Sequence, residues 1–467
     1  SMNPFQRDSL VNDPIHGYIP FTSTGGVPND EVAEQQIIDH PWLQRLRQIH
    51  QLQTAWWVFP AAEHTRFQHV LGAMHLASRW TAMLDQSLRT VCPDTPSRGY
   101  IDVLMRMAAL LHDVGHGPFG HFFDAHFLKD FGLNHELLGG QIIRRELGPM
   151  LRGVRRSPNA AMEPGETLDP EQIAVLIARP RADQGEALPE WLRLLRCLFS
   201  GLYTVDNMDF VLRDAYMSGY SARAFDLQRL LHYSTFTPAG LTIHERGLSS
   251  LVRFIAVRGE LFQAIYFHRT VRAIDLDLQG LFADSKKHLF PGNPLDHLDE
   301  YQRLTEWSIL VRVSEWSRAD DPVLRDLGLR WQKLLRREVQ WKMACERTIV
   351  FRPGVSERSS VFSDAATFES AVRGHLPDAI RAIPLKVDTA RLVHRPGAHA
   401  PAAGQNFLYD TASDEIRGLD DRELFRQLPV SFRICRVYAQ DNRHDRELAR
   451  AMDRLLQSGD ADDVTNM

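Results

Sequence analysis

The chain has 467 residues, of which 44% are hydrophobic and 24% are charged, with a formal net charge of −5 and a pI near 6.5. These are the proportions of a globular protein, and at roughly 150 residues per domain they allow two or three folding units. The acidic balance argues against a protein that coats nucleic acid, because phosphate backbones are bound mainly by clustered Lys and Arg. Nucleic acid is therefore not expected as a partner.

The cysteines and the apolar runs exclude several further classes. Cys92, Cys197, Cys345 and Cys435 are far apart and form no CxxC pair, which predicts neither a disulfide framework nor a thiolate zinc site. No apolar run reaches about 18 residues, and the amino terminus is not basic and then apolar, so neither a membrane span nor a signal peptide is expected. The sequence therefore predicts a cytoplasmic protein without a membrane partner.

Helical periodicity dominates the chain. Apolar residues recur at 3-4-3 spacing at Val70, Ala73, Ala77 and Trp80. Similar patterns follow at 99–113, 206–216 and 255–282, whereas the clearest strand is 431–440, followed by a further helical pattern. We expect a mainly α fold with a helical domain at 1–290, a helical extension at 291–375, and a small α+β lobe at 376–467 that ends in a mobile tail.

Histidines are concentrated in one part of the sequence. Ten of the 20 lie between residues 40 and 135. Neutral imidazole is a common metal ligand and a general acid or base near neutral pH, so this enrichment predicts a chemical site.

The doublet His112-Asp113 closes an apolar helix that the following "GHGPFG" must end. His69 and Asp206 each stand at the start of another predicted helix and complete a set of two imidazoles and two carboxylates. Such a mixed set suits one divalent Mn, Fe, Zn, Ni or Mg per subunit. An isolated His-Asp pair is also compatible with an ordinary surface hydrogen bond.

The longer motifs carry a family resemblance. The order His69, His112-Asp113, Asp206 resembles that of HD-domain metal phosphohydrolases. Five segments are similar to the catalytic core of the SAM-and-HD-domain deoxynucleoside triphosphate (dNTP) triphosphohydrolases, without their SAM domain: 11–21, 39–52, 58–77, 109–124 and 134–136. The resemblance implies an HD-domain helical fold and hydrolysis of dNTPs to deoxynucleoside and inorganic triphosphate.

The same resemblance implies roles for individual residues. His135, oriented by Asp124, corresponds to the acid–base group, with His121 and His116 as further catalytic candidates. The implied substrate-binding residues are Gln51, Arg66, His116, His121, Asn207, Phe210, Asp214, Arg258 and Tyr266. At two of these positions the sequence departs from the family: Phe210 replaces a tyrosine that packs near the deoxyribose, and Asn207 replaces a phosphate-binding lysine.

A regulatory site is implied at Asp39, Gln44 and Arg47, which match a trio that reads guanine between subunits of the family's oligomers. This predicts a homo-oligomer, a dimer to a tetramer or larger, activated by GTP or dGTP. The alternative is a helix-capping Asp39 with two exposed helical residues three positions apart. Ser9 replaces another phosphate-binding lysine of the family, and the segment 22–30 is an insertion.

Two other functions stay open at this point. An HD site is indifferent to what the phosphate carries, so the substrate could be a monophosphate or a signalling nucleotide. The fold could also serve a nucleotide-sensing or nucleic-acid-binding protein with little hydrolysis.

Overall fold

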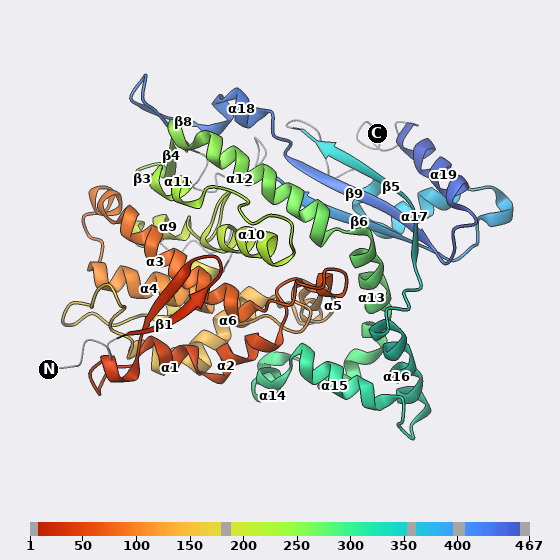
Figure 1. The fold of residues 1–467 in the computed structure, drawn as a ribbon, viewed down its shortest axis with the longest axis horizontal. Helices are drawn as coiled ribbons and strands as arrows, with labels where there is room; N and C mark the ends of the chain where they lie inside the picture. Colours follow the sequence, from red (N-terminus) through yellow and green to blue (C-terminus); the bar gives the residue numbers. More distant parts are fainter. Residues whose placement is uncertain (1–7, 179–187, 353–360, 396–406, 458–467) are drawn as a thin grey trace. The chain divides into compact units, whose positions relative to one another are not determined.

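The structure, a computed structural model, describes residues 8–178, 188–352, 361–395 and 407–457 (Figure 1). Helices dominate these ranges and accompany three small sheets, which confirms the expected mainly α fold. The predicted mobile tail after residue 457 lies outside the described residues. No helix in the described ranges combines the length and apolar content needed to cross a bilayer.

The chain forms two compact units, each assembled from separate stretches of sequence. The first unit comprises 1–254, 286–312 and 402–419, and the second comprises 255–285, 313–401 and 420–467. These limits differ from the consecutive segments expected to end at residues 290 and 375. The reason is that chain distant in sequence packs into the first unit: Tyr301 Oη, for example, donates a buried hydrogen bond to the Gly115 carbonyl.

Three helices form the centre of the first unit: α3 (Arg66–Val91) packs against α4 (Arg98–Leu111) and α10 (Val205–Met217). Nearly all of α4 is buried, beyond the single stripe expected from its periodicity, because its charged residues have internal partners such as Glu34, which accepts from Arg106 Nε at 2.6 Å. The other helices of this unit are α1 (Glu34–Ile38), α2 (Pro41–Gln44), α5 (His121–His126), α6 (His135–Ile142), α7 (Gly148–Arg152), α8 (Pro170–Ile177), α9 (Glu190–Arg196), α11 (Leu227–His232) and α14 (Leu298–Arg303).

Two sheets belong to the first unit. Strands β1 (Asp8–Asp13) and β2 (Gly17–Thr22) form an antiparallel hairpin, whose turn uses Gly17 at φ +73°. The second sheet has the order β3-β4-β7-β8, in which only β4 and β7 are parallel. Its strands are β3 (Ser234–Thr237), β4 (Gly240–His244), β7 (Phe407–Asp410) and β8 (Glu415–Gly418).

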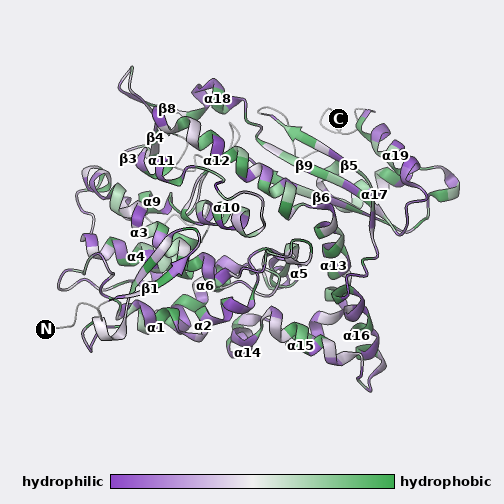
Figure 2. Ribbon diagram, in the orientation of Figure 1, coloured by the Kyte–Doolittle hydropathy of each residue, from purple (hydrophilic) through white to green (hydrophobic). Residues whose placement is uncertain are grey.

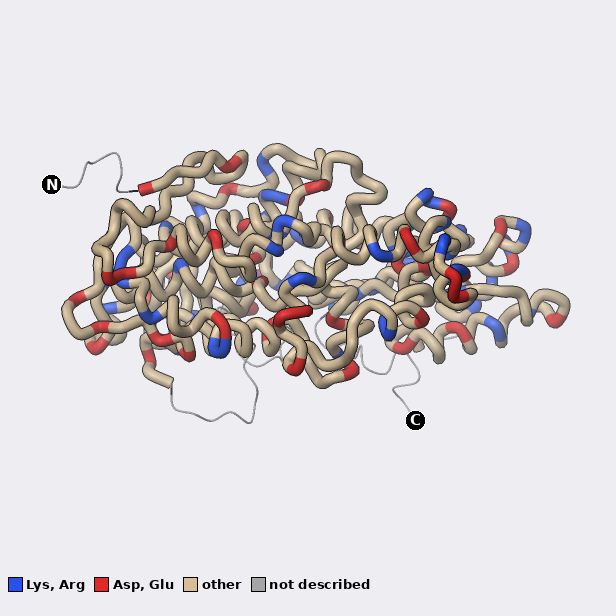
Figure 3. Tube along the Cα trace, turned by 90° about the horizontal axis from the view of Figure 1, so that it is seen from below, with Lys and Arg blue, Asp and Glu red and all other residues tan. Residues whose placement is uncertain are grey.

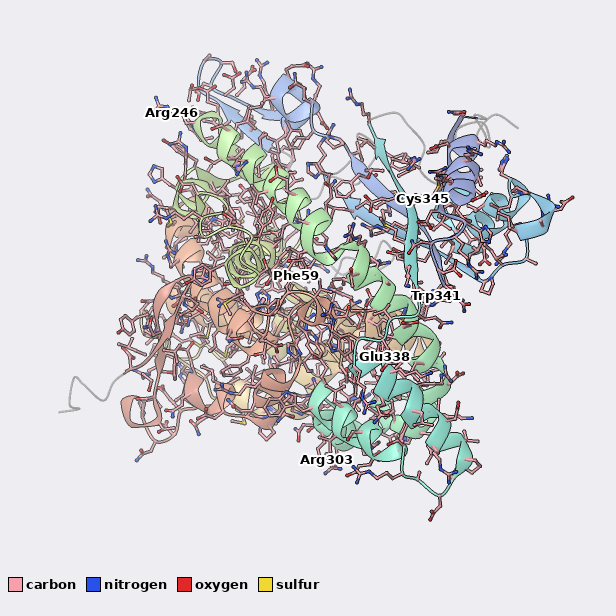
Figure 4. All side chains as sticks on the ribbon, turned by 45° about the vertical axis from the view of Figure 1, so that its right-hand side comes forward. Phe59, Arg246, Arg303, Glu338, Trp341 and Cys345 are labelled. Carbon is pink, nitrogen blue, oxygen red and sulfur yellow. The ribbon has the colours of Figure 1, made fainter. Side chains whose placement is uncertain are left out.

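The second unit is built on an antiparallel sheet of order β5-β9-β6, formed by β5 (Lys342–Phe351), β9 (Ser431–Ala439) and β6 (Leu385–Val393). Helices α17 (Ala365–Gly374) and α19 (Asp445–Gln457) share a buried apolar cluster with this sheet that includes Cys345, labelled on β5 in Figure 4. Helix α16 (Pro322–Leu335) buries one face, which includes Trp331, and its apolar and polar residues can be followed in Figure 2. A short helix, α18 (Glu423–Arg426), also belongs to this unit.

Helices α12 (Leu248–Leu261), α13 (Arg269–Leu289) and α15 (Glu306–Trp316) run through the limits between the units. The helical pattern predicted at 255–282 is present, but it is divided between two helices. Helix α12 passes into a π-helical turn, η8 (Phe262–Tyr266), and α13 starts only at Arg269. Packing explains the break, because Phe262, Tyr266 and Phe267 turn toward an apolar cluster formed with β6 and β9.

Candidate functional site

Four side chains from the ends of three helices meet in the first unit. His69 lies in the first turn of α3, His112 caps the carboxyl end of α4 and Asp206 lies in the first turn of α10. His69 Nε2 is 3.2 Å from His112 Nε2 and 3.0 Å from Asp206 Oδ1. Asp113 places Oδ1 3.4 Å from His112 Nε2. The structure thus brings His69, His112 and Asp206 together as one group that could hold a metal ion, and it places Asp113 beside His112.

The hydrogen bonds at Nδ1 of His69 and His112 indicate which kind of ligand the cluster can bind. His69 Nδ1 lies 2.7 Å from a carboxylate oxygen of Asp209, and His112 Nδ1 lies 2.6 Å from the Ala109 carbonyl. Both partners only accept, so each Nδ1 carries a proton and each Nε2 faces the cluster, where its lone pair becomes available when a cation displaces the proton there. Two imidazole nitrogens and one carboxylate close to one another, with a second carboxylate beside them, fit a divalent cation.

The local charge agrees with this assignment. Burial alone would lower the pKa of His69, but Asp206 and Asp209 outweigh it and raise that pKa to about 10. The pKa of His112 is raised in the same way, against burial, by Asp113 and Asp206. For Asp113, burial is outweighed by His112, Arg66 and His116, which hold its pKa well below the usual range. The carboxylates are ionised, so the cluster favours a bound positive charge.

Asp209 supports the cluster from α10. Its carboxylate accepts from Arg213 Nε at 3.0 Å and contacts His16 Nε2 at 2.6 Å, in addition to His69. Arg213 Nη1 also donates to Asp13 Oδ1 at 2.6 Å, at the end of strand β1. These supporting roles were not predicted from the sequence, in which their one local signal is that Asp209 and Arg213 share a helical face with Asp206.

Arg66 lies next to the cluster. Its Nη1 donates to Asp113 Oδ2 at 2.8 Å, while its buried Nε has no hydrogen-bond partner among the described residues. The turn at 115–120 packs against it so closely that a Cβ on Gly120, at φ +57°, would lie 2.5 Å from Arg66 Nη2. The neighbouring Phe119 also has a positive φ of +64°. An anion near the cluster would find this guanidinium beside it.

A second group of imidazoles lies beside the first. His135 Nδ1 is 2.5 Å from Asp124 Oδ2, and the His135 ring stacks on His116 with centroids 3.7 Å apart and planes 11° apart. His121, mostly exposed, places Nδ1 3.9 Å from Asp124 Oδ2. Burial, together with Arg66 and His135, holds the pKa of His116 well below its ordinary value. Burial alone would raise the pKa of Asp124, but the hydrogen bonds from His121 and His135 outweigh burial and lower that pKa.

Among the described residues, His116, His121 and His135 form one of two groups close enough to share a metal ion, the other being His69, His112 and Asp206. A metal is bound along a lone pair in the plane of the imidazole ring. Because the His116 and His135 rings are parallel and stacked, they cannot both direct such lone pairs at one ion. The cluster with His69 is therefore the better metal site.

The other predicted substrate-binding residues of the first unit are Asp214, Gln51, Asn207 and Phe210. Asp214 Oδ1 lies 2.7 Å from the buried His64 Nε2, and the Gln51 backbone N–H donates to the His64 backbone carbonyl. Gln51 Oε1 is buried without a hydrogen-bond partner among the described residues. Asn207 caps α10, since its Oδ1 accepts from the Thr204 amide at 2.6 Å and its Nδ2 donates to the Leu202 carbonyl. Phe210, half-buried, lies one turn after Asp206.

Two predicted substrate residues, Arg258 and Tyr266, belong to the second unit. The Arg258 guanidinium lies 5.5 Å from the centre of the Phe262 ring, and Tyr266 packs against the cluster on β6 and β9. Their contribution to the site stays a prediction.

Of the three residues predicted to bind guanine, Gln44 and Arg47 contact each other. Arg47 Nε donates to Gln44 Oε1 at 2.8 Å, and its guanidinium lies 3.9 Å from the centre of the Phe67 ring. Gln44 Nε2 donates to the Ile38 carbonyl, and Asp39 is exposed at the end of α1. The contact between Gln44 and Arg47 is the one expected of exposed helical neighbours, and the guanine site stays a prediction.

Comparison with known proteins identifies part of this architecture. Residues 66–179 match the HD domain family and include His69, His112 and Asp113. The chain is 28% identical over 348 residues to the uncharacterized protein YwfO of Bacillus subtilis, covering 70% of each protein. It is 26% identical over 343 residues to human deoxynucleoside triphosphate triphosphohydrolase SAMHD1, covering 68% of this chain and 52% of the human protein.

A crystal structure of a hypothetical protein from Aquifex aeolicus shows a similar fold, with a TM-score of 0.67 and 21% identity, covering 95% of this chain and all of that one. The chain spans about half the length of several curated relatives that it matches. It contains an HD domain and has distant homologues among the dNTP triphosphohydrolases, which supports a metal-dependent phosphohydrolase.

Proposed function

We propose that the protein hydrolyses dNTPs to deoxynucleoside and inorganic triphosphate, with one divalent Mn, Fe, Zn, Ni or Mg held by His69, His112, Asp113 and Asp206. The observation that carries the proposal is the juxtaposition of two sets of groups. His69, His112 and Asp206 lie close enough to share a metal ion with Asp113 beside them, and Arg66, His116 and the His135–Asp124 pair are their neighbours. The distant SAMHD1 relatives, named as dNTP triphosphohydrolases, support the choice of substrate.

The phosphates need positive charge and hydrogen-bond donors: Arg66 supplies both, and His116, whose lowered pKa keeps it neutral, supplies a ring N–H. Asp113 holds one end of the Arg66 guanidinium, and the buried Nε is left to face an anion. A bound cation would add charge neutralisation and Lewis-acid activation of the phosphoryl group. In this arrangement Arg66 orients the triphosphate so that its α-phosphorus lies against the four metal-binding side chains.

His135 provides the proton that the leaving group needs. Water adds to the α-phosphorus, and the bond from phosphorus to the 5′ oxygen breaks, so that this oxygen must gain a proton. Asp124 fixes the His135 Nδ1–H, and the opposite nitrogen can then carry the transferable proton. A positioned acid of this kind accelerates such a step by about 10²–10⁴-fold.

The deoxyribose lies against α10 in this proposal. Asp214, whose Oδ1 is held by His64, and Gln51, whose Oε1 is buried and unbonded, are the groups we assign to the 3′-hydroxyl. Phe210 supplies an apolar surface for the sugar without the phenol of the family's tyrosine. Asn207 is engaged in capping α10 and contributes shape rather than charge.

The test is a panel of dNTPs, ribonucleoside triphosphates, monophosphates and signalling nucleotides, incubated with metal-loaded protein and resolved by chromatography. We expect deoxynucleoside and inorganic triphosphate from dNTPs. Release of monophosphate and pyrophosphate, or turnover of another nucleotide class alone, would contradict the proposal. Binding of dNTPs by metal-loaded protein without any turnover would point instead to a nucleotide sensor.

A further inference from the structure

A short segment outside the matched HD range lies against the turn that carries the predicted active-site histidines. We call residues 301–306, from the last turn of α14 to the first residue of α15, the brace. Tyr301 Oη donates to the Gly115 carbonyl at 2.7 Å. The buried Arg45 joins the two segments, since its Nη1 donates to the His116 carbonyl at 2.7 Å and its Nη2 to the Leu304 carbonyl at 2.8 Å.

The last residue of the brace, Glu306, makes the most specific contacts. Its side chain is 0% exposed, and one carboxylate oxygen accepts from the His50 amide at 3.1 Å and from His50 Nδ1 at 2.6 Å. The other oxygen accepts from the Phe119 amide at 2.8 Å. Phe119 has a φ of +64°, a conformation that is uncommon for a residue with a side chain. Glu306 therefore stabilises a strained position of the turn.

Both segments that Glu306 holds carry residues of the proposed substrate site. Backbone hydrogen bonds pair the segment 49–51 with 64–66, including one from the Arg66 amide to the Ile49 carbonyl at 3.0 Å. In the turn, His116 precedes Phe119 and Gly120 contacts Arg66 directly. Glu306 thus connects the two backbones that place Arg66 and His116, and no contact of its own reaches the four metal-binding side chains.

The charge of Glu306 is balanced inside the first unit. His50 lies between Glu306 and the exposed Glu63, and its ring stacks on Trp56 at 4.4 Å. Burial alone would lower the pKa of His50, but the two carboxylates outweigh it and raise that pKa. A buried carboxylate with three donors is satisfied, whereas removal of its charge leaves the His50 imidazolium and the Phe119 amide with a poorer partner.

We propose that Glu306 is a positioning residue for triphosphate binding: it holds the backbones at His50 and Phe119 so that Arg66 and His116 face the same phosphates. The inference rests on the proposed function and adds to it a residue nearly 200 positions beyond Phe119 in the sequence. Glu306 acts through these backbones and does not touch the substrate.

The first test compares Glu306→Gln with Glu63→Gln, the matched change at the other, exposed partner of His50. The glutamine amide places an N–H where a carboxylate oxygen accepted, so we expect KM for dNTP and the Kd for inorganic triphosphate to rise at least about tenfold, with metal content unchanged. Glu63→Gln should stay within about twofold of the parent. Parent-like constants for folded, metal-loaded Glu306→Gln would overturn the proposal.

A second pair of variants covers the case in which Glu306→Gln does not fold. His50→Asn keeps an N–H near the position of Nδ1, whereas His50→Gln places its amide near the position of Nε2, and both lose the ring that stacks on Trp56. We expect His50→Asn to retain more triphosphate affinity than His50→Gln. Equal affinities in folded proteins would contradict a role of the bond to Glu306.

Hydrogen exchange separates failure of this inference from failure of the proposed function. If the metal-loaded parent neither hydrolyses dNTPs nor binds triphosphate, the proposed function fails. Exchange at residues 115–120 still decides the structural half of the inference. Faster exchange there in Glu306→Gln or His50→Gln than in Glu63→Gln supports it, and unchanged exchange overturns it.

Discussion

Histidine serves three different purposes in the first unit, and the partner of its Nδ1 decides which. In His69 and His112, acceptors at Nδ1 leave Nε2 facing the cluster. In His135, Asp124 at Nδ1 leaves the opposite nitrogen for proton transfer. In His50, carboxylates lie at both nitrogens, which favours the imidazolium. The same residue type is therefore suited to metal binding, to proton transfer or to an ion pair according to its neighbours.

The first prediction concerns metal binding. Asp113→Ala and His112→Ala should each lose bound metal and turnover, because each removes one of the four side chains that meet at the cluster. Elemental analysis of purified protein measures the metal, with Asp130→Ala, at an exposed aspartate paired with Lys286, as the control. Full metal occupancy in either cluster variant would contradict the ligand assignment.

The second prediction separates catalysis from metal binding. His135→Ala should keep its metal and lose turnover by about 10²–10⁴-fold, the range expected of a general acid. His126→Ala, at a nearby histidine that packs on Phe122, is the control and should retain turnover. If kcat of His135→Ala stayed within about threefold of the parent, well short of that range, His135 would have only a structural role.

At the scale of elements, the candidate metal centre depends on how closely α3 and α10 approach. Gly72 on α3 faces Asp209 and Arg213 on α10, and a Cβ there would lie 2.2 Å from Asp209 Oδ1 and 2.2 Å from Arg213 Nη2. A side chain at this position therefore has no space. The absence of a side chain at Gly72 lets Asp209 reach His69.

Gly72→Ala should consequently disturb both stability and metal binding. Overpacking costs roughly 1–3 kcal/mol, and a displaced Asp209 would leave His69 without its acceptor at Nδ1. Unfolding midpoints and metal Kd values measure the two effects. Gly280→Ala on α13 is the control, since its Cβ would meet no described atom within 4 Å and alanine favours the helix. Equal results for the two variants would show that α3 and α10 can separate at no cost.

The contact between Glu306 on α15 and His50 in the loop before α3 predicts that stability depends on pH. The folded-state pKa of His50 is raised above 6.5 by Glu306 and Glu63, against the effect of burial. Its contribution to the free energy of unfolding is therefore fully present below pH 6.5 and is lost as the pH rises through the folded-state pKa. The difference in unfolding midpoint between the parent and His50→Gln should shrink as the pH rises above about 6.5 and through the raised folded-state pKa. A difference that is constant or grows over this range would contradict the raised pKa.

At the scale of the whole molecule, the chain alternates between two units. Helices α12, α13 and α15 each begin in one unit and end in the other, so that neither unit is a continuous piece of sequence. Acidic and basic residues are interspersed along the described chain, as Figure 3 shows, in keeping with the net charge of −5. Association with other copies would therefore depend on local sites rather than on a single charged surface.

Regulation by a guanine nucleotide is the last prediction. Asp39 and Arg47 are exposed, and an aspartate with an arginine suits the donors and acceptors of guanine. We expect GTP or dGTP to increase dNTP hydrolysis and to shift the protein toward larger oligomers, and Arg47→Ala to abolish both responses. Turnover and sedimentation of metal-loaded protein, with and without the nucleotide, are the measurements. If neither changes, the trio serves only the fold.

Local sequence determined the mainly α fold, the HD motif and the positions of α3, α4 and α10, because these features depend on residues a few positions apart. The strands β5 and β6 were not predicted, because their pairing partner β9 is distant in sequence and no local pattern shows the pairing. The roles of Glu306, Arg45 and His16 depended on the tertiary structure alone. Glu306 is 256 residues from His50 and His16 is 193 from Asp209, and no local pattern specifies which distant side chain will satisfy a buried donor.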